Sequence, residues 1–125
     1  MIVLDSSALL ALLLDEPGAE SVARHLAEST MSTVNLCEVI AVAQRAGRSP
    51  QRLEVALRAS PISFAAFEVE HAMAAGRLEA TTRPPGLSLG DRACLALAIA
   101  RDLPVLTADR AWARLELPIA VEVIR

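Results

Sequence analysis

The sequence of 125 residues contains no lysine and no tyrosine, and its aromatic residues are one tryptophan and two phenylalanines. With so few aromatic rings, the chain has no stacking surface for the bases of a single-stranded nucleic acid. The net charge of −3 at pH 7 also argues against an indiscriminate nucleic-acid binder. All 12 basic residues are arginines, which suit bidentate contacts with phosphate, although a GC-rich genome gives the same bias.

Long apolar runs are missing too, although 54% of the residues are hydrophobic. No window reaches the roughly 20 uninterrupted apolar residues that a membrane span needs. The N-terminus lacks the basic start and the cleavage site of a signal peptide, so we expect a cytoplasmic protein with no membrane partner. The two cysteines, Cys37 and Cys94, fall within helical patterns, and we expect them to be reduced core residues because cytosolic disulfides are rare.

Several catalytic signatures are absent as well. The sequence has no G-x-G-x-x-G fingerprint, no P-loop and no G-x-S-x-G nucleophile elbow. His25 and His71 are isolated, and we expect them to be surface or packing residues, not metal ligands. These absences leave the carboxylates as the candidates for chemistry.

Short apolar segments alternate with helical patterns along the chain. We expect strands at residues 2–4, 31–33, 61–64, 104–107 and 119–124. We expect helices at residues 8–14, 19–28, 34–46, 50–59, 67–80 and 89–102, with a short one around Trp112, which would anchor it in the core. Residues 81–86 predict a surface loop. The alternation predicts an α/β fold in one domain, 1–125, whose parallel β-sheet carries helices on both faces.

The hydrophobic patterns also predict which faces of two helices are buried. In the helix at 67–80, we expect Val69 and Met73 to face inward. In the helix at 34–46, the expected packing surface includes Cys37 and Ile40, and Glu38 lies on a neighbouring stripe with Asn35.

Two aspartates follow apolar strands in the same way. Asp5 comes directly after residues 2–4, and Asp109 follows residues 104–107. The carboxyl ends of parallel strands meet at one rim of the sheet, where open α/β sheets bind their ligands. Alternatively, each aspartate only caps the helix that follows it.

Two further acids fall where they can reach the same rim. Asp91 stands in Ser88-Leu89-Gly90-Asp91, which has the spacing of a capping box. However, the helix that it opens is apolar almost all round, so Asp91 shares an inward face with Cys94. Glu38 lies early in the helix after the second strand, and its first turns project over the rim. A lone glutamate on such a helix is most often simply solvated.

Convergence of these four acids would require cations. Two like charges about 5 Å apart repel by roughly 3 kcal/mol at an effective dielectric constant near 20. Oxygen ligands without paired histidine or cysteine suit Mg²⁺ or Mn²⁺ and not zinc. Such a site serves metal-assisted phosphoryl chemistry.

Four segments together resemble the PIN-domain nucleases and, more narrowly, the VapC toxins of bacterial toxin–antitoxin pairs. These segments are residues 3–7, 34–39, 86–92 and 106–112. Each motif alone is weak, but the four occur in the right order and at the usual spacing over essentially the whole chain. The resemblance implies a three-layer PIN-like domain and a Mg²⁺- or Mn²⁺-dependent endoribonuclease. It also implies an RNA substrate, homodimerisation, and neutralisation by a VapB-type antitoxin whose C-terminal segment covers the active site.

The resemblance also implies residue roles. The acidic site would consist of Asp5, Glu38, Asp91 and Asp109, with Asp5 and Asp91 as the firmest metal ligands. Glu38 and Asp109 would act through water or on a second ion.

Ser6, Asn35 and Thr107 have polar groups beside these acids and would support them. Arg45, Arg92 and Arg110 are candidates for phosphate contacts, with solvated surface charges as the alternative.

Three other classes of protein are alternatives: two match the sequence less well than the PIN domains do, and one stays open. A receiver domain places its phosphoacceptor aspartate at the end of the third strand, where Ser63-Phe64 stands, and needs a late lysine, which this chain lacks. A haloacid-dehalogenase-like phosphatase needs a second aspartate at position 7, which is Ser7. A non-catalytic binding module stays open, because the acids could serve only as helix caps.

Overall fold

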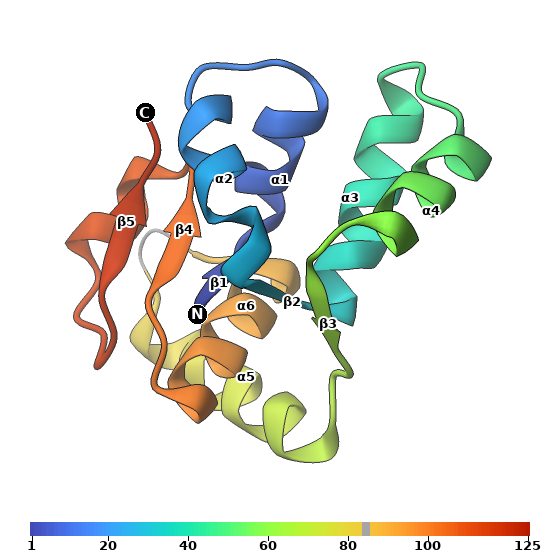
Figure 1. Cartoon of the computed structure of the whole chain (residues 1–125). Coiled ribbons are helices and arrows are strands. Elements are labelled where there is room, and N and C mark those ends of the chain that lie inside the picture. Colours follow the sequence, from blue (N-terminus) through green and yellow to red (C-terminus); the bar gives the residue numbers. More distant parts are fainter. Residues whose placement is uncertain (84–85) are drawn as a thin grey trace.

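The structure, a computed structural model, describes residues 1–83 and 86–125. In this part of the chain, five parallel strands form one sheet (Figure 1). The strands are β1 (Ile2–Leu4), β2 (Ser29–Ser32), β3 (Ser63–Ala65), β4 (Val105–Thr107) and β5 (Val121–Val123). Their order across the sheet is β3-β2-β1-β4-β5, and all neighbouring pairs are parallel. The central strand is therefore β1, which leads directly into Asp5.

Helices cover both faces of this sheet (Figure 1). They are α1 (Ser6–Leu13), α2 (Ala19–His25), α3 (Thr33–Arg45), α4 (Pro50–Ala59), α5 (Val69–Thr81) and α6 (Leu89–Arg101), with 3₁₀ helices η1 (Leu26–Glu28) and η2 (Arg110–Arg114). Two residues of the predicted loop at 81–86, numbers 84 and 85, lie outside the described residues. In the described residues, no helix is both long enough and apolar enough to span a membrane.

Two hydrophobic cores lie on opposite faces of the sheet, because successive side chains of a strand point to opposite faces. Ile2 and Leu4 of β1 pack into one core with α1, α2 and α3, whereas Val3 packs into the other with α6 and Trp112. Trp112 is fully buried, as expected for an anchor. The prediction of a parallel sheet between two helical layers is confirmed.

The buried helix α6 lies between β1 and α5. Residues 93–98 form an unbroken buried run, so this helix is covered on all sides, as its apolar composition predicts. Because α6 is held so rigidly, the residues of its first turn have defined positions at the rim of the sheet.

Several predicted boundaries were wrong by one to three residues. Strand β2 begins at Ser29, two residues earlier than expected, because its hydroxyls are satisfied in the interior. Ser29 Oγ donates to the carbonyl of His25, and Thr30 Oγ1 donates to that of Ser63. A polar strand of this kind has no apolar pattern to reveal it. Helix α1 begins at Ser6, so Asp5 occupies the N-cap position in place of Ser6 or Ser7.

The predicted face of α5 was wrong, and that of α3 was wrong in part, since Ile40 packs against the core as expected and Cys37 does not. Val69 and Met73 are 64% and 61% exposed, because α5 presents the small residue Ala75 to α6. Cys37 is exposed, and only Cys94 is a buried core residue. In α3 the buried stripe consists of Asn35, Val39 and Ala43, and a pattern based on apolar residues overlooks a stripe that begins with an amide. The two histidines are surface residues as expected: His25 contacts Glu28, and His71 belongs to the capping box of α5.

Candidate metal centre at the carboxyl edge of the sheet

The strand order creates a switch point between β1 and β4. Strand β2 pairs with one edge of β1, and β4 pairs with the opposite edge. Ligands of open α/β sheets bind where the strand order changes direction in this way. Asp5 follows β1 directly, and Asp109 lies two residues after β4. Glu38 lies in the second turn of α3 and Asp91 in the first turn of α6, and these two helices pack together. Four different elements thus bring acids towards this point.

Asp5 is the most deeply buried of the four acids, with 2% of its surface exposed. One carboxylate oxygen, Oδ2, accepts hydrogen bonds from Ser7 Oγ (2.5 Å) and Thr107 Oγ1 (2.9 Å). The other oxygen, Oδ1, is buried without a hydrogen-bond partner among the described residues. The pKa of Asp5 is raised from 3.8 to about 6. Burial is the main cause and the negative charge of Asp91 adds to it, whereas hydrogen bonds from the hydroxyls of Ser7 and Thr107 and from the backbone of Ser6 act in the opposite direction.

Backbone N–H groups hold the two hydroxyls around Asp5 in place. Ser7 Oγ accepts a hydrogen bond from the backbone N–H of Ala108 (2.9 Å), and Thr107 Oγ1 accepts one from that of Asp109 (3.1 Å). Both hydroxyls lie in donor range of Asp5 Oδ2, and they also lie 3.2 Å from each other. The carboxylate presents one saturated oxygen and one free oxygen, and the same contacts tie the start of α1 to the loop after β4.

The structure separates the roles of the two serines after Asp5. Sequence reasoning selected Ser6, whose hydroxyl donates to the carbonyl of Asn35 (3.3 Å), and it overlooked Ser7, which contacts the carboxylate. The spacing was an available signal, because a serine two residues after an N-cap aspartate lies close enough to return a hydrogen bond to it.

Replacing Ser7 with alanine should weaken the site without removing any acid. The variant loses one donor to Asp5 and leaves the N–H of Ala108 without its acceptor, so we expect the free energy of unfolding to fall by about 1–3 kcal/mol. We also expect about tenfold weaker Mn²⁺ binding, because Asp5 is less well oriented. Urea unfolding and Mn²⁺ titration measure the two effects. Ser21→Ala on α2 is the control, and equal behaviour of the two variants would contradict the assigned role.

Asn35 connects three helices beneath the acids. It is fully buried, and its Nδ2 donates to Ser6 Oγ (3.0 Å) and to the carbonyl of Gly90 (2.9 Å). One amide group thus joins α1, α3 and the first turn of α6. This contact lies immediately before Asp91 and one helical turn before Glu38.

Asp91 is a half-buried helix cap with a perturbed carboxylate. Its Oδ2 accepts from the backbone N–H of Ser88 (3.0 Å), and Ser88 Oγ accepts from that of Asp91 (3.2 Å), so the predicted capping box is confirmed. Burial raises its pKa, and so do the charges of Glu38 and Asp109, although the hydrogen bonds from Ser88 lower it. Asp91 is therefore the acid that interacts electrostatically with each of the other three.

Asp109 and Glu38 are the more accessible acids. Asp109 is exposed, and its Oδ1 caps η2 by accepting from the N–H of Ala111 (2.9 Å). Glu38 is half-buried, and its carboxylate lies against the backbone of Gly90. Both acids thus lie nearer the surface than Asp5 does.

The donors suit a hard divalent cation. They are all oxygens, one of them is a buried carboxylate oxygen with no partner in the described structure, and their charges repel one another. Across residues 1–83 and 86–125, no three histidine, cysteine, aspartate or glutamate side chains are close enough together to hold one ion jointly. The carboxylates therefore share one electrostatic environment without forming a closed ligand set.

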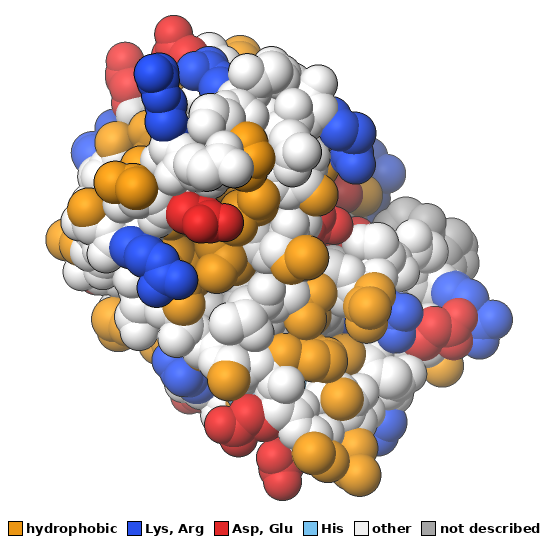
Figure 2. Space-filling model, turned by 90° about the vertical axis from the view of Figure 1, so that its right-hand side faces the viewer, with side chains coloured by type: hydrophobic (Ala, Val, Ile, Leu, Met, Phe, Trp, Pro, Cys, Tyr) orange, Lys and Arg blue, Asp and Glu red, His pale blue; other side chains and the backbone are white. Residues whose placement is uncertain are grey.

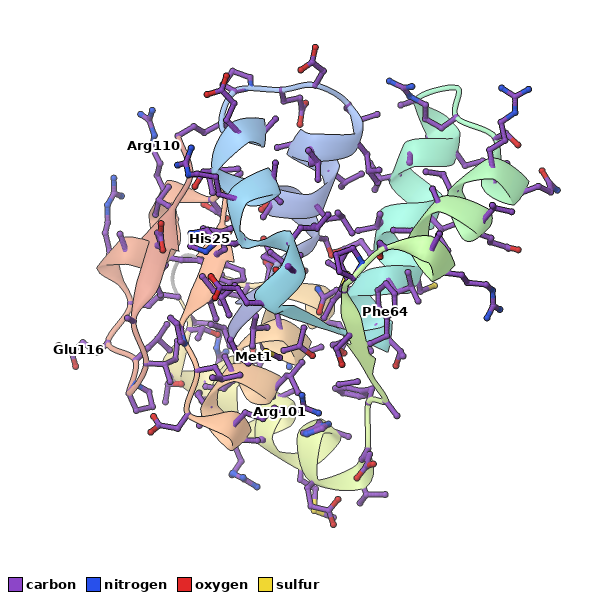
Figure 3. All side chains as sticks on the ribbon, in the orientation of Figure 1. Met1, His25, Phe64, Arg101, Arg110 and Glu116 are labelled. Carbon is purple, nitrogen blue, oxygen red and sulfur yellow. The ribbon has the colours of Figure 1, made fainter. Side chains whose placement is uncertain are left out.

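Two of the candidate arginines are engaged elsewhere. Arg92 donates from its guanidinium to the carbonyl of Ala75 (2.9 Å), and Arg110 donates to that of Arg125 (2.9 Å). Arg110 lies beside the C-terminal strand, far from α3 and α4 (Figure 3). Arg45 is exposed in the last turn of α3, and its contact with phosphate stays a prediction.

The strand order defines an α/β domain in which Asp5 and Asp109 follow the two strands on either side of the switch point. The chain belongs to the PIN domain family, whose model matches residues 2–117. This result confirms the resemblance to PIN domains that the four sequence segments indicate.

Solved structures show the same fold. A toxin–antitoxin complex from Klebsiella pneumoniae matches with a TM-score of 0.80 at 18% identity, covering 100% of this chain and 98% of that one. DNA-bound VapBC from Salmonella typhimurium matches at 0.72 and 20% identity, with complete coverage of both chains. VapBC-5 from Mycobacterium tuberculosis matches at 0.61 and 24% identity, covering 99% of this chain and 97% of that one. No curated protein sequence matches the chain.

Proposed function

We propose that this chain is a Mg²⁺- or Mn²⁺-dependent endoribonuclease that acts in the cytoplasm as the toxin of a type II toxin–antitoxin pair. The observation that carries the proposal is Asp5. Its carboxylate is buried at the switch point, its pKa is raised, and its Oδ1 has no partner among the described residues. The hydrogen bonds from Ser7 and Thr107 satisfy only one of its two oxygens, so burying the charge is unfavourable in the metal-free fold, and a bound cation would offset this cost.

The four acids have distinct roles in this proposal. Asp5 Oδ1 and the free oxygen of Asp91 hold the cation, and Glu38 and Asp109 orient water or a second ion. When bound, the cation supplies an activated water and neutralises charge on the phosphodiester. Ser7 and Thr107 both donate to Oδ2 of Asp5, which leaves Oδ1 as the oxygen that would bind the cation. Hydrolysis in line would leave 5′-phosphate and 3′-hydroxyl ends.

The partner proposal rests on the structural relatives and on one face of the molecule. The matched structures from K. pneumoniae, S. typhimurium and M. tuberculosis are described as a toxin–antitoxin complex or as VapBC. In this chain, Leu36, Ile40 and Phe64 line an apolar groove of about 330 Å³, which Glu54 and Arg58 border. Figure 2 shows hydrophobic side chains across the middle of this side of the molecule, and Figure 3 shows Phe64 beside α4. An antitoxin segment of apolar side chains would fit this groove.

A homodimer is the second part of the partner proposal. Val69 and Met73 on α5 and Leu89 at the start of α6 are each more than half exposed. Contiguous apolar patches are typical of surfaces that another protein covers, and Val69 and Met73 lie one helical turn apart on α5. Light scattering of the purified chain should therefore give twice its mass of 13.3 kDa.

A non-catalytic binding module is the alternative, and the caps favour it. Asp91 closes a capping box and Asp109 caps η2, so both have structural roles that need no cation. Asp5 makes no cap hydrogen bond to α1, and its Oδ1 has no partner among the described residues. The two functions therefore differ in what they predict for Asp5 and for added metal.

Cleavage of structured RNA tests the proposal directly. The purified chain is incubated with RNA in Mg²⁺, in Mn²⁺ and in EDTA, beside Asp91→Asn. The control is Asp102→Asn, which changes an exposed aspartate at the other end of the same helix. We expect cleavage only with metal, 5′-phosphate products, and loss of cleavage in Asp91→Asn alone. Mn²⁺ binding without cleavage of any RNA would favour the binding module.

A further inference from the structure

Gly90 occupies the second position of α6, where its missing side chain leaves room for Glu38. A methyl carbon added at Gly90 would lie 2.8 Å from Oε2, 2.9 Å from Oε1 and 3.0 Å from Cδ of Glu38. These distances are shorter than real Cβ contacts, so the Glu38 carboxylate stands where any other residue would place its side chain. The backbone itself has no need of glycine here, since Gly90 is helical and its φ is not positive.

The close approach is built by the elements beneath it. Asn35 lies one turn before Glu38 on α3, and its buried amide donates to the carbonyl of Gly90 (2.9 Å). This hydrogen bond draws the first turn of α6 against α3. Glu38 then lies across Gly90, and the next residue of α6 is Asp91. The two carboxylates are therefore held as neighbours by one hydrogen bond and one missing side chain.

Glycine at this position destabilises the helix, so its advantage must lie in something other than helix stability. Alanine is the strongest helix former and glycine one of the weakest. Gly76 of α5 provides the contrast, because a methyl group added there meets no atom of the described residues within 4 Å. Of these two helical glycines, only Gly90 touches a carboxylate of the site.

We propose that Gly90 is a positioning residue, which lets the Glu38 carboxylate lie against the first turn of α6, beside Asp91, and orient water or a second ion at the metal site. This inference rests on the metal site of the proposed function but not on RNA being the substrate. It assigns the placement of Glu38 to a residue that has no side chain of its own.

The test replaces Gly90 with alanine and follows three properties. The added methyl meets only the end of a flexible side chain, so we expect the fold to persist with an unchanged or higher melting temperature. A crystal structure of the metal-free variant should show the Glu38 carboxylate displaced from Gly90. Mn²⁺ titration should show affinity weaker by about tenfold or more, as for Glu38→Ala. Gly76→Ala is the matched control and should bind Mn²⁺ as the unmodified chain does.

A double-variant cycle shows whether Gly90 acts through Glu38. In a Glu38→Ala background, Gly90→Ala should weaken Mn²⁺ binding no further. The proposal would be overturned if the two substitutions weakened Mn²⁺ binding independently of each other. It would also be overturned if Gly90→Ala left the Mn²⁺ affinity unchanged, or if the Glu38 carboxylate kept its position in that variant. An RNA cleavage assay on the same proteins separates the two proposals. If the Mn²⁺ pattern holds without any cleavage, the nuclease function fails and the role of Gly90 stands, whereas an unmodified chain that binds no Mn²⁺ refutes both.

Discussion

Replacing Asp5 with asparagine should abolish metal-dependent RNA cleavage and, at the same time, make the metal-free protein more stable at neutral pH. The cleavage rate should fall by about 10³-fold or more, because the variant loses the buried oxygen that binds the cation, which supplies several kcal/mol of charge stabilisation. Gel assays of RNA cleavage in Mn²⁺ measure this loss.

The gain in stability follows from the burial of the Asp5 charge. The pKa of Asp5 rises from its ordinary value of 3.8 to about 6 in the folded state. At pH 7 the ionised carboxylate therefore lowers the free energy of unfolding by about 3 kcal/mol. Asparagine is neutral, and its carbonyl oxygen retains the hydrogen bonds from Ser7 and Thr107. Its amide nitrogen becomes a buried donor, which offsets part of the gain, so we expect a net increase of about 1–2 kcal/mol in the free energy of unfolding.

The control for this experiment is Asp15→Asn. Asp15 is exposed and has φ 54°, a conformation that asparagine adopts readily, so this variant should change neither cleavage nor stability. An Asp5→Asn protein that is inactive but less stable than the unmodified chain would mean that the carboxylate is a structural group. That result would remove the main support for the metal site.

The metal-free protein should lose stability as the pH rises from about 4 to about 6. Asp5 binds its proton more tightly in the folded state than in the unfolded chain, so its contribution is fully present below pH 3.8 and is lost as the pH passes about 6. Asp91 acts in the same direction, since burial also raises its pKa. Thermal unfolding in EDTA across this range measures the effect, and the decrease should be smaller in Asp5→Asn.

Divalent cations should reverse this loss at neutral pH. At a concentration 100 times its Kd, Mn²⁺ should raise the free energy of unfolding by about 2.7 kcal/mol at pH 7. At pH 4.5 the gain should be smaller, because protons compete for the carboxylates. Equal stabilisation at both pH values, or stabilisation of Asp5→Asn to the same extent, would show that the cation binds elsewhere.

Three of the four acids stand in sequence patterns that can be recognised without a structure. Asp5 and Asp109 follow short apolar strands, and Asp91 opens a helix that is apolar all round. These are local patterns, since a strand that runs into a helix is encoded within about ten residues. The segments around them also suffice to indicate the PIN family, and the family model confirms it.

Other features escaped this reasoning because they depend on contacts between distant segments. The burial of β2 depends on hydroxyls that find carbonyl partners, one of them 33 residues away, and the phase of α3 is set by Asn35 as a core residue. The hydrophobic pattern predicts that Val69 and Met73 face the core, but both are exposed, and Ala75 is the buried residue of α5. Hydrophobicity alone does not distinguish such surfaces.

The sequence by itself determined the alternation of strands and helices, the parallel sheet and the acids that follow its strands, because periodicity and cap residues act over a few neighbouring positions. Only the tertiary structure decided that Thr107 contacts Asp5, that Asn35 joins Ser6 to Gly90, and that Glu38 lies in the space left by Gly90. These outcomes depend on hydrogen-bond directions and close packing between elements 29 to 102 residues apart, which arise only once the sheet has assembled.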